Sequence, residues 1–140
     1  MTEALVHRGP DSGGVTALGR CVLGHRRLKV LDLETGDQPA LNESGDVVCV
    51  FNGELYHFQD VRRSLAERGH VVPGTGDTAV IPHVYEDHGP DFPTQLRGMF
   101  AIALWDRARE RLVLARDRVG KKPLHYVCLL YTSPSPRDRS

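Results

Sequence analysis

Short apolar runs separated by polar turns fill the first third of the chain, and this pattern predicts β-strands. Each run is rich in valine and leucine and is bounded by a turn such as Gly19-Arg20. The predicted strands are residues 15–18, 21–24, 29–33 and 47–51. Because tight turns join them, we expect neighbouring strands to pair antiparallel.

Two helices are expected in the middle of the chain. Residues 58–68 carry apolar side chains at helical spacing with charges between them, and Gly69 follows as a stop. Residues 78–88 predict a second helix, with Asp77 or Thr78 as its N-terminal cap.

The pattern returns to strands in the last third of the chain. The apolar runs 99–105 and 111–115 flank a polar turn and predict a strand pair, and residues 124–127 predict a further strand. Hairpin-linked strands with two helices between them indicate an α+β layered domain with a mostly antiparallel sheet.

The two ends of the chain differ in character from the rest. Residues 1–6 are typical of the last turn or two of a helix whose beginning is absent. Residues 129–140 change abruptly to a serine- and proline-containing stretch that cannot continue a strand. We therefore expect one partial domain over residues 1–128 and a disordered or foreign tail over 129–140.

Composition and charge narrow the class of partner. The 140 residues include 40% hydrophobic side chains and equal numbers of acidic and basic side chains, 18 of each, which suits one domain with a real core. Without a basic face, neither nucleic acid nor a membrane is expected as a partner, and a small neutral or zwitterionic ligand fits better. Three widely spaced cysteines without pairing motifs, and no apolar stretch near the ~18 residues of a membrane span, predict a cytoplasmic protein.

Three short segments contain residues that could together bind a free amino acid. Arg27 can clamp a carboxylate with two parallel hydrogen bonds, and Asp77 can pair with an ammonium. Asn52 and Gly53 offer a side-chain amide beside an unhindered backbone N–H, which together can form an oxyanion hole. The segments are 24–28, 51–56 and 74–78.

Each of these residues also has a structural interpretation. Arg27 could form a surface ion pair, Asp77 could cap a helix, and Asn-Gly after an apolar strand is by default a type I′ hairpin turn. The residues after Gly53 lead into a helix rather than a returning strand, which weakens the turn interpretation. Asp32 and Asp117 are interpreted as loop carboxylates. The seven histidines show no metal-ligand spacing, so the sequence predicts no metal site.

Eight motifs in order resemble one family. Taken together, they are similar to the glutaminase domain of class II glutamine amidotransferases, and in particular to the asparagine-synthetase type. The resemblance covers residues 1–126. The motifs are HRGPD at 7–11, GHRRL at 24–28, D at 32, QP at 38–39, FNGELY at 51–56, GDT at 76–78, GMFAIALWD at 98–106 and ARDRVGKKPLHY at 115–126.

The resemblance implies a fold and a set of roles. The family fold is the αββα sandwich of N-terminal nucleophile hydrolases. By resemblance, Arg27 would bind the α-carboxylate of L-glutamine, and Asp77 would bind its α-amino group with help from Glu54. Asn52 and Gly53 would form the oxyanion hole. Three further residues would line the pocket: Leu28, Val30 and Leu31.

The family nucleophile has no counterpart in this chain. It is a cysteine at the mature N-terminus, whereas no cysteine precedes His7 here. Thr2 lies inside the expected helix remnant and is a poor substitute, because a nucleophile must first be correctly placed. The sequence therefore predicts a truncated glutaminase domain without activity of its own.

Partners and cofactors follow from the same resemblance. No cofactor is expected in this domain, and ATP and magnesium are implied only for a synthetase domain that is absent here. The sequence leaves open whether the chain forms a homodimer over an edge exposed by the missing strand. Two alternatives remain: a non-catalytic amino-acid-binding or regulatory module, and a glutaminase domain that serves another acceptor such as a sugar phosphate or a phosphoribosyl substrate.

Overall fold

The computed structural model describes residues 1–28 and 38–129. Short helical turns η1 and η2 accompany two α-helices and two antiparallel sheets. In chain order the elements are η1 (Thr2–Leu5), β1 (Ser12–Leu18), β2 (Cys21–Arg27), β3 (Ala40–Leu41), β4 (Val47–Tyr56), α1 (Phe58–Glu67), α2 (Val80–His88), η2 (Gly89–Gln95), β5 (Arg97–Asp106) and β6 (Arg111–Arg116).

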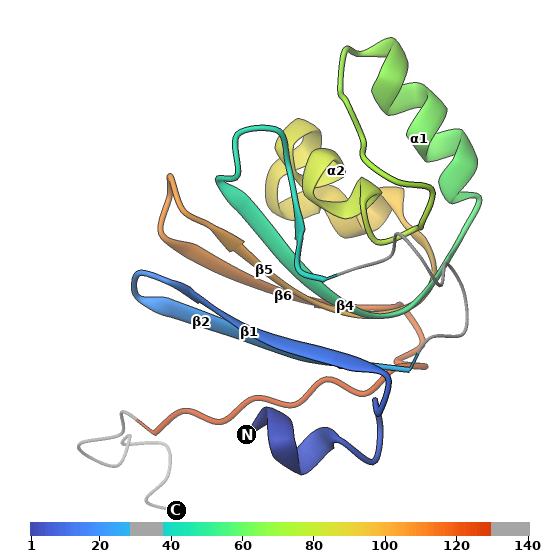
Figure 1. The fold of residues 1–140 in the computed structure, drawn as a ribbon. Coiled ribbons are helices and arrows are strands. Elements are labelled where there is room, and N and C mark those ends of the chain that lie inside the picture. Colours follow the sequence, from blue (N-terminus) through green and yellow to red (C-terminus); the bar gives the residue numbers. More distant parts are fainter. Residues whose placement is uncertain (29–37, 130–140) are drawn as a thin grey trace, which may run out of the picture.

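The sheets confirm the predicted α+β class with antiparallel pairing. One sheet has the strand order β3-β4-β5-β6, and β4 and β5 pair along their whole length, from Val47↔Asp106 to Tyr56↔Arg97. The other sheet is the β1-β2 hairpin, closed by the predicted two-residue turn between Leu18 and Cys21. Figure 1 shows α1 and α2 on one face of the larger sheet and the hairpin on the other.

The helix-facing side of the larger sheet holds the main core. Side chains of a strand alternate between its two faces, so alternate residues of β4 and β5 point toward the helices. The strands contribute Val47, Cys49, Phe51, Leu55, Phe100, Ile102 and Leu104, and the helical segments contribute Leu65, Val80, Ile81, Val84, Tyr85 and Phe92. All of these side chains are buried.

The hairpin-facing side carries a smaller cluster. Its buried members are Leu18 and Leu23 from the hairpin and Val48 and Trp105 from the larger sheet. On the far side of the hairpin, Thr2 of η1 packs so closely over Gly24 that a side chain at Gly24 would overlap its methyl group. Within residues 1–28 and 38–129, no helix is long and apolar enough to cross a membrane.

Helix α1 ends as its sequence predicts. Gly69 adopts a positive φ of 93°, its N–H donates to the carbonyl of Ala66, and the N–H of His70 donates to the carbonyl of Leu65. This pair of hydrogen bonds is the Schellman arrangement that glycine permits after a helix. Its consequence is that His70 is turned back toward α2.

Three local predictions need correction or fall outside the described residues. Helix α2 begins after Ala79 without a side-chain cap, so neither Asp77 nor Thr78 caps it. Residues 124–127 form no strand, because no neighbouring strand pairs with them among the described residues. The predicted strand 29–33 lies outside the described residues, as does most of the predicted tail.

Candidate active site along the edge of β4

Asn52 and Gly53 lie inside β4 and form no turn. Asn52 pairs with Ala101 and Gly53 with Phe100 of β5, which excludes the hairpin-turn interpretation. By strand alternation, the side chains of Asn52 and Glu54 point to the hairpin-facing side, away from the main core. Asn52 is exposed and Glu54 is half-buried. The amide of Asn52 is therefore accessible to a ligand.

Gly53 allows β4 to approach β5 closely. Its φ is 156°, and a Cβ at this position would overlap the carbonyl oxygen of Met99. Gly98 has the same role on the facing strand, where a Cβ would overlap the carbonyl oxygen of Glu54. Any side chain at Gly53 would push the strands apart and displace its own N–H.

Two side chains occupy the backbone donors on either side of Gly53. The N–H of Phe51 donates to Gln38 Oε1 and the carbonyl of Phe51 accepts from Gln38 Nε2, both at 2.8 Å. The N–H of Leu55 donates to Asp77 Oδ2 at 2.9 Å. Backbone groups two residues apart face the same edge of a strand, so the N–H of Gly53 lies between these two positions. By the same alternation this N–H points away from β5, toward the other edge of β4.

Asp77 is brought to β4 by the segment that precedes α2. Arg62 holds that segment in place, with Nη2 donating to the carbonyl of Gly76 at 2.6 Å and Nη1 to that of Val72 at 3.0 Å. The carboxylate oxygen Oδ2 of Asp77 accepts a hydrogen bond from the N–H of Leu55. The carboxylate is thus fixed beside Gly53 rather than at a helix terminus.

Arg27 is the last residue of β2, in the layer below β4. Its carbonyl accepts from the N–H of Asp11 at 3.1 Å, and the neighbouring Arg26 donates through Nε to the carbonyl of Gly9 at 3.0 Å. These bonds fasten the segment around Gly9 and Asp11 to the end of β2. One guanidinium nitrogen of Arg27, Nη1, is shielded from solvent. The C-terminal ends of β2 and β4 point to the same side of the molecule (Figure 1).

Of the three residues predicted to line the pocket, only Leu28 belongs to the described part of the chain. Leu28 follows β2 and is 56% exposed, so it contributes no packing to the core. Val30 and Leu31 lie outside the described residues. Of the predicted site, the structure brings Asn52, Gly53 and Asp77 together along the end of β4.

Cys21 and Cys49 are poorly suited to attack a ligand at Gly53. Cys49 points into the main core, and burial raises the pKa of its thiol well above the ordinary value. Cys21 starts β2 at the far end of the hairpin from Arg27, and burial raises the pKa of its thiol as well. Both shifts disfavour the thiolate, which is the reactive form. Cys128 is exposed in the segment after β6.

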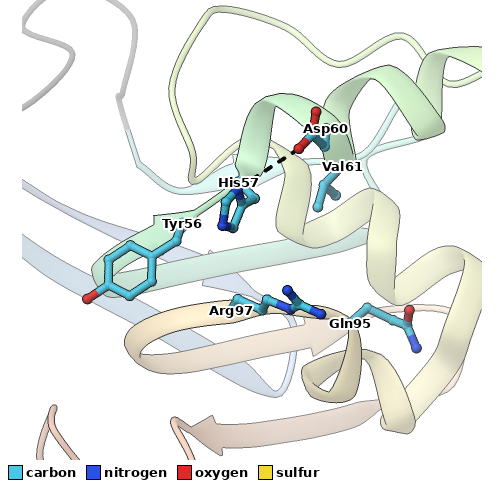
Figure 2. Close-up of a pocket in the computed structure, with 6 residues that line it drawn as sticks. All are labelled: Tyr56, His57, Asp60, Val61, Gln95 and Arg97. Atoms are coloured by element: carbon cyan, nitrogen blue, oxygen red, sulfur yellow. Dashed lines mark ion pairs between the residues drawn. The ribbon is translucent and has the colours of Figure 1, made fainter.

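A pocket of about 400 Å³ opens elsewhere on the molecule. Figure 2 shows its lining residues, with the ring of Tyr56 directed away from the rest and Arg97 extending beneath the first turn of α1. His57 Nδ1 and Asp60 Oδ2 face each other across 4.0 Å at its rim. The lining includes none of the predicted site residues, so we do not place the active site there.

Asp117 has a larger structural role than a loop carboxylate. It is buried and accepts backbone hydrogen bonds from Phe100 at 3.1 Å, Val119 at 3.2 Å, Lys121 at 2.8 Å and Lys122 at 3.0 Å. Burial alone would raise its pKa, but these donors outweigh burial and bring the pKa to about 2. Because Phe100 pairs with Gly53, Asp117 braces the site from the opposite side of β5.

Comparison with known proteins places the chain in a family. Residues 1–133 match the glutamine amidotransferase domain. The chain belongs to this family. It is 41% identical over 126 residues to "Asparagine synthetase [glutamine-hydrolyzing] 2" of Bacillus subtilis (strain 168), covering 90% of this chain and 17% of that protein.

Further relatives of the glutamine amidotransferase domain give the same result. The chain is 42% identical to the asparagine synthetase of Asparagus officinalis, over 89% of this chain and 21% of the relative. It is 44% identical to asparagine synthetase 3 of Bacillus subtilis (strain 168), over 90% of this chain and 21% of the relative. The chain therefore spans about a fifth of the length of these relatives.

Proposed function

We propose that this chain is the glutamine-binding part of an ammonia-supplying domain of the asparagine-synthetase type. The observation that carries the proposal is the row of donors at the edge of β4. Gln38 and Asp77 occupy the N–H groups of Phe51 and Leu55, which leaves the N–H of Gly53 between them, next to the exposed amide of Asn52. Two converging donors of this kind stabilise the oxyanion that forms when an amide is attacked.

In the proposal, charged side chains around this row of donors form a clamp that holds the α-carboxylate and the α-ammonium of the substrate. Arg27 holds the α-carboxylate of L-glutamine, and the remaining oxygen of Asp77, with Glu54, holds the α-ammonium. The aliphatic part of the substrate lies against Leu28, Val30 and Leu31, of which the last two are outside the described residues. No metal or cofactor is required for these contacts.

The proposed reaction needs a thiol that none of the three cysteines of this chain provides. A thiolate adds to the side-chain amide carbon, the carbon–nitrogen bond breaks, and the nitrogen leaves as ammonia after taking up a proton. Water then cleaves the thioester and releases glutamate. In the proposal, the thiol comes from polypeptide outside residues 1–140, as does the fourth layer of an αββα N-terminal nucleophile hydrolase.

The acceptor of the ammonia is proposed from the relatives. Similarity to asparagine synthetases favours aspartate, activated with ATP and magnesium in a separate synthetase domain, over a sugar phosphate or phosphoribosyl acceptor. The rival proposal is a cytoplasmic module that binds an amino acid without chemistry. It is supported by the burial of Cys49 in the main core and by the raised pKa values of the Cys21 and Cys49 thiols. An in-frame Met-Cys-Gly opening in the genomic sequence upstream would support the enzyme, and an upstream stop codon would support the module.

Ligand binding tests the clamp directly. We expect the 140-residue chain to bind glutamine at least tenfold more tightly than 4-carbamoylbutanoate, which lacks the α-amino group, because a desolvated Asp77 would lose its partner. Titration calorimetry or ligand-detected NMR measures this ratio. Arg27→Ala and Asp77→Ala should each weaken glutamine binding, whereas Arg63→Ala, a change at an exposed arginine of α1, should not. Equal binding of both ligands would remove the clamp assignment.

Turnover tests the assignment of the nucleophile. We expect the 140-residue chain to release no ammonia from glutamine above background, because loss of a catalytic nucleophile can cost about a millionfold in turnover. A coupled ammonia assay checks this expectation. Ammonia release that is abolished by Arg27→Ala would contradict it and direct attention to Thr2, Cys21 and Cys49.

A further inference from the structure

Four side chains from distant parts of the chain converge at α2. Glu43 lies in the turn between β3 and β4, His70 follows the end of α1, and His83 and Glu86 lie on successive turns of α2. Each offers one nitrogen or oxygen atom, and these four atoms all lie within 4.8 Å of one another. None of the four belongs to the proposed glutamine site.

The separations between these side chains are close to those in a tetrahedral ion site, with one oxygen of Glu43 nearest to each histidine. His70 Nδ1 lies 3.3 Å from Glu43 Oε1 and 3.8 Å from Glu86 Oε2, and His83 Nδ1 lies 3.1 Å from Glu43 Oε2. Ligands at zinc bond lengths of about 2.0–2.1 Å stand about 3.3–3.4 Å apart at the corners of a tetrahedron. An ion at the centre therefore requires only small side-chain movements.

His83 gives an independent reason to expect a ligand. It is fully buried, with 0% exposure, and neither ring nitrogen has a hydrogen-bond partner among residues 1–28 and 38–129. Its approach to Glu43 at 3.1 Å lacks hydrogen-bond geometry. Buried polar groups normally have a partner. A bound cation would provide one for the ring nitrogen that faces Glu43.

The surrounding residues hold three of the four side chains in position. The N–H of Val71 donates to Glu43 Oε1 at 2.8 Å, and Asn42 Nδ2 donates to Glu86 Oε2 at 3.4 Å. His70 Nε2 lies 3.0 Å from Asp87 Oδ1. A carboxylate on the outer nitrogen of a histidine is the usual support for a metal-bound ring, because it fixes which nitrogen carries the proton.

We propose that Glu43, His70, His83 and Glu86 bind one zinc ion in a structural site. Two imidazoles with two carboxylates suit zinc better than magnesium or calcium, which prefer oxygen ligands alone. Two carboxylates and two neutral imidazoles also balance the charge of a divalent ion. Because four protein ligands close the coordination shell, the ion ties the β3–β4 turn and the end of α1 to α2 and takes no part in turnover.

The test is zinc titration of the full 140-residue chain after dialysis against a chelator. We expect one ion per chain by calorimetry, and a rise in the thermal unfolding temperature with zinc concentration, because a ligand that binds only the folded state stabilises it. Cobalt(II) should give the intense visible absorption of a tetrahedral site. Magnesium should produce neither effect.

Matched variants decide whether these residues are the ligands. Glu86→Gln and His70→Gln should each lower zinc affinity at least tenfold, since each removes a ligand. His57→Asn is the control, because His57 is an exposed histidine outside the cluster and asparagine tolerates its positive φ. Glu86 is itself exposed, so Glu86→Gln should keep the fold, as circular dichroism would show. Absence of zinc binding, or unchanged affinity in Glu86→Gln, would overturn the proposal.

Discussion

The two faces of the larger sheet differ in how they are packed. The helix-facing side buries residues of β4, β5, α2 and η2 in one large cluster, whereas the hairpin-facing side buries only Leu18, Leu23, Val48 and Trp105 among the described residues. The exposed Asn52 and half-buried Glu54 point to the lightly packed side. A single strand, β4, therefore contributes to stability with one set of alternate residues and to the proposed chemistry with the other.

This division predicts that stability and function can be changed separately. Substitutions on the helix-facing side should unfold the chain, and substitutions of exposed residues on the hairpin-facing side should leave the fold intact. Gly53 is the exception, because its backbone serves both purposes. The following changes test this division.

The largest loss of stability is expected from Phe100→Ala. Phe100 is 1% exposed in the main core, and truncation of such a residue costs about 3–5 kcal/mol. Leu23→Ala, in the small cluster, should cost about 2 kcal/mol, the low end for leucine, because fewer neighbours surround it. Urea unfolding of both variants measures the difference. Equal losses would show that the two faces contribute alike.

Asn52→Ala should impair turnover without impairing the fold. In a form of the domain that includes the catalytic thiol, loss of one oxyanion donor should lower turnover about 100- to 1000-fold. The Michaelis constant should change far less, and the free energy of unfolding by less than about 0.5 kcal/mol, because the side chain is exposed. Steady-state kinetics and urea unfolding check the two parts. Normal turnover in this variant would show that Asn52 has no role in the oxyanion hole.

Gly53→Ala and Gly98→Ala form a matched pair. Each new Cβ would overlap a carbonyl oxygen of the facing strand, so each variant should lose about 1–3 kcal/mol of stability. Only Gly53→Ala displaces the N–H of Gly53, the proposed oxyanion donor. Only this variant should therefore also lose turnover, by about as much as Asn52→Ala does. Turnover measured at equal concentrations of folded protein separates the loss of catalysis from the loss of stability. The same kinetic loss in Gly98→Ala would assign the effect to strand separation.

The lowered pKa of Asp117 predicts how the stability of the fold depends on pH. Its pKa is lowered from 3.8 to about 2, so its contribution is present above pH 3.8 and is lost as the pH falls toward 2. Asp117→Asn should flatten this part of the stability curve, because its side chain does not titrate. Thermal unfolding between pH 5 and pH 2 measures the change. A curve of unchanged shape in the variant would show that other carboxylates govern acid unfolding.

Local patterns in the sequence predict the elements well where side-chain periodicity is strong. The helix expected over 58–68 is Phe58–Glu67, and the glycine stop at Gly69 has the predicted geometry. The strands around Leu18 and Cys21 also form as expected. The strand expected over 124–127 fails because strand formation depends on a paired neighbour, which periodicity alone does not reveal.

Contacts over long sequence separations could not be predicted from local patterns. Aspartate is a common helix cap, but Asp77 binds the N–H of Leu55 instead, because Arg62 holds the loop that contains it. Gln38 shows no local sign that its amide will bind Phe51. The histidine and glutamate cluster extends from Glu43 to Glu86, so its ligand spacing is invisible along the chain. The roles assigned to Arg27 and Glu54 remain predictions.

The edge of β4 also bears on self-association. An exposed strand edge offers a ladder of donors and acceptors to any other extended polypeptide, and this is a common start of aggregation. Gln38 covers both backbone groups of Phe51, and Asp77 covers the N–H of Leu55. Another strand could bind the N–H of Gly53 but not the N–H groups of Phe51 and Leu55 on either side of it. One such donor is too few for a stable ladder. The same two side chains that flank this donor thus oppose pairing of this part of β4 with another strand.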